Sequence, residues 1–129
     1  MKKTGIIIAI LLVITGCLIY SYMYQEHRNI LKENAEYSIS SSQLYEEFYN
    51  SYELANKKFI NTVVEFHGPL SQLDNEYIII HPKIVCKLDS NFSTDNLILG
   101  DSLLLKGRCI GFDDLFMEVK MDNVSFMKR

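Results

Sequence analysis

Residues 107–114, GRCIGFDD, combine side chains that carry chemistry in many proteins. Cys109 stands between two glycines, and the adjacent acids Asp113 and Asp114 follow. A thiol in this setting could bind a metal or react, a glycine-rich loop could cradle a phosphate, and paired acids could serve in acid–base chemistry or hold calcium. The same residues also fit a purely structural role at the end of a strand.

The spacing of the reactive residues argues against the chemical alternatives. From residue 40 onward the soft metal ligands are His67, His81, Cys86 and Cys109, and they contain neither the closely spaced cysteine pair nor the closely spaced histidine pair that is typical of structural zinc sites. GRCIG lacks the spacing of a dinucleotide fingerprint, and the sequence has no P-loop or HExxH motif. Adjacent acids after a glycine are typical of solvated turns. The sequence therefore predicts no metal, no cofactor and no catalytic site.

Apolar periodicity indicates which elements position these residues. A capping box of Ser40 and Gln43 precedes an apolar stripe at helical spacing, which predicts one amphipathic helix over about 41–58. After residue 61 the period changes to two, which predicts strands over 62–68, 76–82, 83–89, 101–110 and 115–121. Five short strands at regular spacing after a single helix favour a mainly β domain built as a small barrel.

The N-terminal twenty-four residues predict a membrane segment. Residues 5–24 carry no charge and would reach about 30 Å as a helix, the thickness of the bilayer hydrocarbon. Three tyrosines at the far end suit the membrane interface, and Lys2 and Lys3 favour an inside N-terminus with the domain extracytoplasmic. The alternative is a lipoprotein anchored at Cys17, since the residues ITGC resemble a lipobox.

The chain after the membrane segment divides into a polar tether over 25–39 and a folded domain over 40–129. Without Lys2 and Lys3, eleven of the thirteen basic residues remain against sixteen acidic ones, which gives a formal charge of −5. Domains that bind nucleic acid through phosphates normally carry the opposite sign. Charge alone therefore makes nucleic acid an unfavourable partner.

Several segments of the domain resemble the bacterial tRNA_anti-like family of OB-fold domains. They are LYEEFYNSYELANKKFINTVVEFHGPL, IVCKL and LILGDSLLLKGRCIGFDDLFMEVKMDNVSF. The resemblance covers roughly residues 42–126. The family's marked glycines and cysteines correspond here to Gly68, Cys86, Gly100, Gly107, Cys109 and Gly111.

The resemblance implies a five-stranded OB-type barrel preceded by the amphipathic helix, with a single N-terminal membrane segment. Gly107 and Gly111 would then lie where a curved strand bends and ends, and Cys109 would point into the core. Cys86 would also face the core, so a disulfide between Cys86 and Cys109 stays open. In an OB barrel their strands are separated by the fifth strand, which places the two Cα atoms at a distance unfavourable for a bond.

One outward surface is the best candidate for a ligand. With Ile78 and Ile80 facing inward, Tyr77, Ile79 and His81 face outward beside Lys87 of the next strand. Aromatic and basic side chains on an OB barrel stack and pair with ligands, although the leading helix could equally cover this surface. The sequence thus predicts a membrane-anchored, non-catalytic module that binds a protein or another extracytoplasmic ligand. Single-stranded nucleic acid or tRNA is the alternative.

Overall fold

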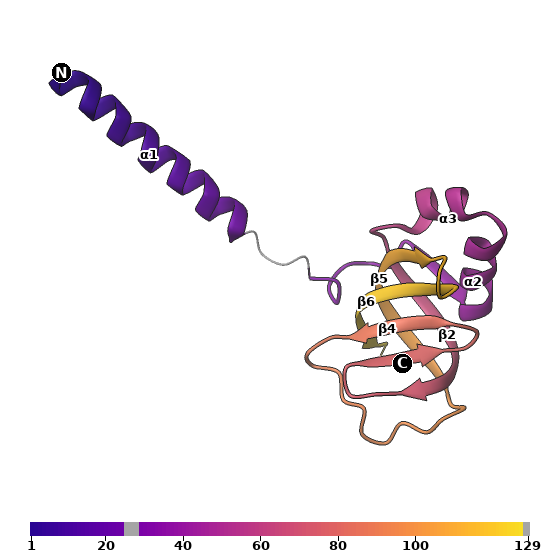
Figure 1. Ribbon diagram of the computed structural model, residues 1–129. Helices are drawn as coiled ribbons and strands as arrows, with labels where there is room; N and C mark the ends of the chain where they lie inside the picture. Colours follow the sequence, from indigo (N-terminus) through magenta and orange to yellow (C-terminus); the bar gives the residue numbers. More distant parts are fainter. Residues whose placement is uncertain (25–28, 128–129) are drawn as a thin grey trace.

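The computed structural model of the chain describes residues 1–24 and 29–127, and over these residues it has three helices and six strands (Figure 1). The helices are α1 (Lys2–Met23), α2 (Ser41–Asn50) and α3 (Tyr52–Phe59). The strands are β1 (Tyr37–Ser40), β2 (Val63–Leu73), β3 (Tyr77–Ile80), β4 (Ile84–Leu88), β5 (Ser102–Asp113) and β6 (Glu118–Phe126). A mainly β domain follows the N-terminal helix, as the sequence predicts.

Helix α1 is separate from the core of the domain. It has 22 residues, all of them described, and none is buried. Its length and apolar composition suffice to cross a bilayer, and they fit a membrane anchor or a signal sequence. Every buried apolar side chain of the described chain comes from Ile30 or later, so the domain holds its whole core without α1.

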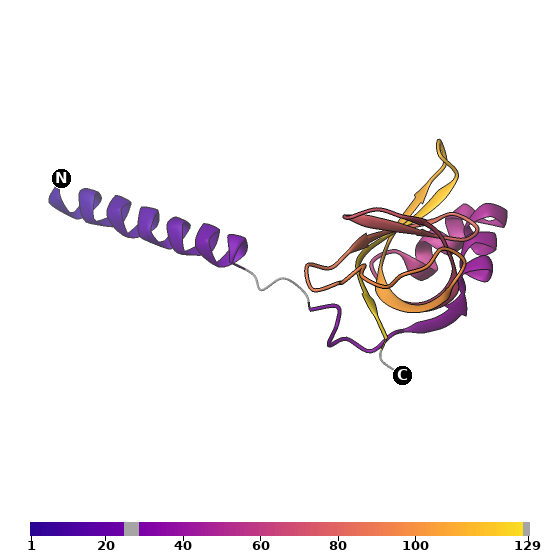
Figure 2. The same ribbon diagram turned by 90° about the horizontal axis from the view of Figure 1, so that it is seen from below.

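Five strands close into a barrel. Their order is β2, β3, β4, β6, β5 and back to β2, with β4 and β6 parallel and all other neighbours antiparallel. This arrangement confirms the predicted five-stranded OB-type barrel. Strand β1 pairs in parallel with β2 outside this ring, and the sequence did not predict it. Figure 2 shows the strands curving around the barrel, with α2 and α3 packed on one side.

Alternation along the strands fills the barrel interior. Ile78 and Ile80 of β3 are fully buried, as are Cys86 of β4 and Cys109 of β5. Their neighbours in sequence face outward, as period-two patterns require. The interior is therefore packed with side chains, which suits a five-stranded barrel of small diameter.

The two glycines that flank Cys109 have structural roles. Gly107 lies beside a register shift between β5 and β6, where an added Cβ would approach Val124 Cγ2 to 2.7 Å. Gly111 lies at the next shift and has a φ of +135°, which L side chains rarely adopt. The structural interpretation of this segment is thus the one that the fold supports.

Two helices stand where the sequence predicts one. The capping box of Ser40 and Gln43 is present and begins α2, which buries Leu44 and Phe48. The helix then breaks at Ser51, whose φ of −153° and ψ of 71° are not helical, and α3 begins at the next residue. Asparagine and serine at positions 50 and 51 are weak helix formers, because their side chains compete for backbone hydrogen bonds.

Part of the predicted tether packs on the barrel. Residues 25–28 lie outside the described chain, but Ile30 is 3% exposed. Lys106 of β5 donates hydrogen bonds from Nζ to the carbonyl oxygens of Leu31 (2.9 Å) and Glu33 (2.8 Å). The domain thus begins to pack ten residues before Ser40, and Lys106 is covered by this segment although it points away from the core.

The predicted strand over 115–121 is wrong at its start. Strand β6 begins at Glu118, and residues 114–117 form the turn that connects it to β5. Leu115 is 80% exposed and Met117 has a φ of +55°, so neither lies in a strand. The apolar alternation that suggested a strand here therefore belongs to an exposed turn.

Candidate functional site

The predicted ligand surface is formed by the outward side chains of β3 and β4, here called the β3–β4 face. Tyr77 pairs across the strands with Lys87, and Ile79 pairs with Val85. Tyr77, Ile79 and Val85 are half-buried and Lys87 is exposed, so the helices leave this face open to solvent. The structure thus brings together an aromatic ring, two aliphatic side chains and a lysine on one outward surface.

His81, the fourth predicted residue, lies at the margin of this face. It follows the end of β3, and its side chain is exposed. Its carbonyl oxygen accepts a hydrogen bond from Ser41 Oγ at the start of α2 (2.5 Å). The backbone of His81 thereby joins β3 to the helix, while its imidazole extends the β3–β4 face only at one end.

The turn beside the β3–β4 face is acidic. Asp74 and Glu76 flank Asn75 between β2 and β3, and all three are exposed. The backbone N–H of Asp74 donates to the carbonyl of Tyr77 (3.0 Å), which keeps these acids next to the aromatic ring. Lys87 therefore shares its end of the face with two carboxylates, which lowers its attraction for a polyanion.

Lys120 of β6 extends the outward surface beyond β4. The register places it beside Val85 of β4 on one side and beside Gly111 of β5 on the other. Its Nζ lies 2.9 Å from Asp113 Oδ2 and 3.8 Å from Glu118 Oε1. The hydrogen bond from Lys120 lowers the pKa of Asp113, and the same bond raises the pKa of Lys120. Both groups stay charged and are occupied with each other near neutral pH.

Beyond Lys120 lies an open pocket of about 350 Å³ between α3 and β5, here called the α3–β5 pocket. Asn56 Oδ1 is buried in it without a hydrogen-bond partner among the described residues. Gly111 forms its floor, since a Cβ there would come within 4.0 Å of this oxygen. Tyr52 and Ile60 line the wall that α3 provides. The pocket thus combines a buried acceptor that lacks a partner with the charged side chains of Asp113, Asp114 and Lys120.

Sequence reasoning missed this pocket. Tyr52, Asn56 and Ile60 follow each other at helical spacing, next to the buried positions of α3. A polar residue beside the apolar stripe was the available signal. The strand that Asn56 contacts depends on the helix break at Ser51, and no local sequence pattern predicts this break.

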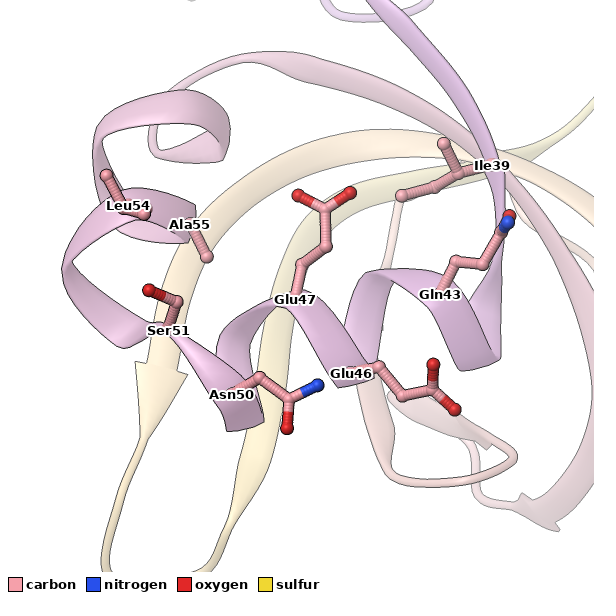
Figure 3. A pocket seen from close by; sticks show the side chains of 8 residues that line it. All are labelled: Ile39, Gln43, Glu46, Glu47, Asn50, Ser51, Leu54 and Ala55. Carbon is pink, nitrogen blue, oxygen red and sulfur yellow. The ribbon is translucent and has the colours of Figure 1, made fainter.

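A groove of about 410 Å³ opens where α2 meets α3 (Figure 3). Figure 3 shows Glu47 extending from α2 toward the space between Ala55 of α3 and Ile39 of β1, and Glu46 and Asn50 of α2 also line the groove. Glu47 is paired with Lys58, whose Nζ lies 2.9 Å from the carboxylate. The groove is acidic at its mouth and has Leu54 exposed at one end.

The two cysteines of the barrel are buried, and they belong to no metal-binding cluster among the described residues. Cys86 and Cys109 lie opposite the same residue, Met121, in the strands on either side of β6. Strands two apart are separated by about 9.5 Å, which exceeds the ~7 Å that a disulfide tolerates, and both thiols are free. The disulfide considered above is thus not formed. Burial raises the pKa of Cys109 to about 11 and raises that of Cys86 further, so both thiols favour the protonated form near neutral pH.

Comparison with known proteins supports the fold. No family model matches the chain, and no curated protein sequence matches it. The chain is similar to a solved structure from Klebsiella pneumoniae subsp. pneumoniae, described as a "putative nucleic acid-binding lipoprotein". The TM-score is 0.53 and the identity is 14%, over 70% of this chain and 91% of the other. At this identity the similarity concerns the fold alone.

Proposed function

We propose that this protein is a membrane-anchored module that binds a protein or another extracytoplasmic ligand on its β3–β4 face and catalyses no reaction. The observation that carries the proposal is the open face itself. Tyr77, Ile79 and Lys87 are held on rigid paired strands and remain accessible, although the helices cover other parts of the barrel. Aromatic side chains of this kind contribute much of the energy in binding surfaces.

The chemistry of the reactive groups supports a non-catalytic role. The thiols of Cys86 and Cys109 are buried with raised pKa values, so neither forms a thiolate readily. Asp113 accepts hydrogen bonds from Lys120 and from two backbone N–H groups, which leaves it poorly suited to accept a proton from a substrate. The filled barrel interior leaves the outer surface as the place where a ligand can bind.

A photo-crosslinking experiment in the native membrane tests the proposal. A benzophenone amino acid at Tyr77 should give a crosslinked product that is lost when Ile79, on the same face, is changed to Asp. The matched control carries the same group at Tyr49, which is 61% exposed on α2. Equal products from both positions, or none from Tyr77, would contradict binding at the β3–β4 face.

The proposed location is the cytoplasmic membrane, with the N-terminus inside and the domain outside. The uncharged run over residues 5–24 and the pair Lys2 and Lys3 support it. Protease added to intact spheroplasts should remove the domain, and protection of the domain would refute this orientation. Lipid labelling that disappears in a Cys17→Ala variant would instead establish a lipoprotein.

Nucleic acid binding is the second candidate, and the description of the Klebsiella protein favours it. A formal charge of −5 over residues 25–129 opposes it, because phosphate contacts need several free cations. Stacking on Tyr77 alone would contribute about 1–3 kcal/mol per base. We therefore expect no binding of fragment 25–129 to single-stranded oligonucleotides or tRNA at physiological salt. A salt-sensitive micromolar affinity by fluorescence anisotropy, weakened by Tyr77→Ala or Lys87→Glu, would restore this function to first place.

The resemblance to the tRNA_anti-like family remains a proposal as well. Its support is the set of glycines and cysteines that occupy structural positions in the barrel, such as Gly107 and Cys109. These residues explain a fold and carry no ligand. Membership in the family would therefore leave the identity of the ligand to the outward side chains.

A further inference from the structure

The turn between β5 and β6 exposes three large apolar side chains in a row. Leu115 is 80% exposed, Phe116 57% and Met117 38%. Turn positions of this kind normally carry polar residues or glycine, and a run of exposed apolar residues usually marks a binding surface. Figure 2 shows the hairpin extending beyond the rest of the barrel, so these side chains lie at a projecting tip.

The backbone of this turn is bonded to side chains behind it. Asp113 Oδ1 accepts hydrogen bonds from the N–H groups of Leu115 (3.0 Å) and Phe116 (3.2 Å). Lys83 Nζ donates to the carbonyl oxygen of Phe116 (2.5 Å). Lys120 in turn pairs with the second oxygen of Asp113 (2.9 Å). Two backbone N–H groups and one carbonyl oxygen of the tip therefore keep a hydrogen-bond partner when the tip leaves water. Paired backbone groups are the main requirement for entering lipid.

The tether holds the domain close to the bilayer in the anchored state. The hydrogen bonds from Lys106 to Leu31 and Glu33 fix where the chain enters the domain. From Met23, the last residue of α1, to Ile30 the chain can span at most about 25 Å. Strand β6 is about 30 Å long at 3.3 Å per residue. The tether packs on Lys106, which pairs with Ser125 near the end of β6, whereas the hairpin tip lies at the start of β6. A barrel lying with β6 along the membrane would therefore bring both the tether and the tip to the same surface.

We propose that residues 115–117 insert into the lipid bilayer in which α1 is anchored, and so hold the barrel against the membrane. The part of the bilayer that these residues contact is the boundary of the acyl chains, and only their apolar side chains reach it. Around the tip the acids Asp113, Asp114 and Glu118 outnumber the lysines at positions 83 and 120, so anionic lipid offers no electrostatic gain. Insertion should accordingly depend little on salt and need no anionic lipid. This inference rests on the proposed membrane anchoring.

Single-tryptophan fluorescence of the full chain tests the inference directly, because the natural sequence contains no tryptophan. The chain is reconstituted in phosphatidylcholine nanodiscs, with or without bromine on the acyl chains. Phe116→Trp reports on the tip, and Leu54→Trp, at a position 67% exposed on α3, is the matched control. Ile8→Trp in α1 reports separately on the anchor.

We expect brominated lipid to quench the tryptophan fluorescence of Phe116→Trp at low and at high salt. Insertion should also shield this tryptophan from quenching by acrylamide. The tryptophan of Leu54→Trp should be quenched by acrylamide and not by brominated lipid. Equal acrylamide quenching at positions 116 and 54 would overturn the inference. Shielding from acrylamide without quenching by bromine would also overturn it, and would indicate a protein partner or a second copy of the chain. If brominated lipid does not quench Ile8→Trp, α1 is not in the bilayer, and both the proposed anchoring and the proposed insertion of the tip are refuted. Quenching at position 8 without quenching at position 116 refutes the insertion of the tip alone.

Discussion

Gly68 lies where β2 closely approaches the start of α2, and Gly68→Ala should destabilise the domain. The sequence predicts that a strand ends near this glycine, but β2 continues through it to Leu73. An added Cβ would overlap Ser41 Oγ and lie 2.8 Å from both Ser41 Cβ and Ile80 Cγ2. Rotation of the serine hydroxyl cannot relieve the contact with its own Cβ, so α2 has to move away from the barrel.

The magnitude follows from what this movement breaks. Displacing α2 stretches the hydrogen bond from Ser41 Oγ to the carbonyl of His81, and leaving that carbonyl unpaired costs about 1–3 kcal/mol. Overpacking against Ile80 adds about 1–3 kcal/mol. Alanine also reduces the backbone freedom of the unfolded chain, which offsets about 0.4–1 kcal/mol of this destabilisation. The net expectation is a loss of about 3 kcal/mol, or roughly 12–24 °C in Tm for a domain of this size.

Urea unfolding of fragment 25–129, followed by circular dichroism, measures this loss. Ser41→Gly alone and the double variant Ser41→Gly/Gly68→Ala complete a double-mutant cycle. Because glycine at position 41 removes both the overlapping Oγ and its Cβ, the double variant should be more stable than the sum of the single effects predicts, by about 1 kcal/mol or more. A cost below about 0.5 kcal/mol for Gly68→Ala, or additive effects, would show that the close approach does not constrain this site.

Three further expectations concern other contacts of the domain. Lys106→Met removes two hydrogen bonds and should speed hydrogen exchange over residues 30–36, with a loss of about 1–3 kcal/mol; unchanged exchange there would refute the role of this lysine. Cys86 and Cys109 should resist alkylation in the native state, since a thiol with a pKa near 11 is about one-thousandth ionised at pH 8; a bond between them after mild oxidation would contradict the strand order. Asp113 has a pKa below the ordinary 3.8, chiefly because Lys120 donates a hydrogen bond to it. Its contribution to stability should thus be present above pH 3.8 and disappear as the pH falls further, so Asp113→Asn should differ from the natural chain only at the higher pH; a difference that persists at low pH would exclude this ion pair as the cause.

Local patterns predicted the fold where local and tertiary forces agree. The alternation that placed Ile78 and Ile80 inward was correct, because burying one face of a strand fixes its register. The pattern failed at residues 115–117, where apolar side chains alternate as in a strand but lie in an exposed turn. Nothing in a short window separates these two cases, because the difference lies in whether another part of the chain covers the side chains.

The candidate site shows the same division. The β3–β4 face was predicted from strand pairing alone, and Tyr77 and Lys87 do lie opposite each other. The α3–β5 pocket was missed, because Asn56 reaches Gly111 only through a helix break and a bulge in β5. Each of these irregularities is a local change in the backbone at a single position. Their combined effect on position is nevertheless large enough to create a site that periodicity cannot place.

Shared fold and shared ligand are separate matters for this barrel. A chain 14% identical to the Klebsiella protein can keep inward residues of the required size while almost every outward residue changes. The ligand therefore has to be inferred from the outward residues, and here Lys87 stands near the carboxylates of Asp74 and Glu76. A phosphate backbone laid along this face would gain one cation and meet two anions. A neutral or basic protein surface that packs on Tyr77 would avoid that repulsion, and electrostatics thus favours a protein partner over a nucleic acid.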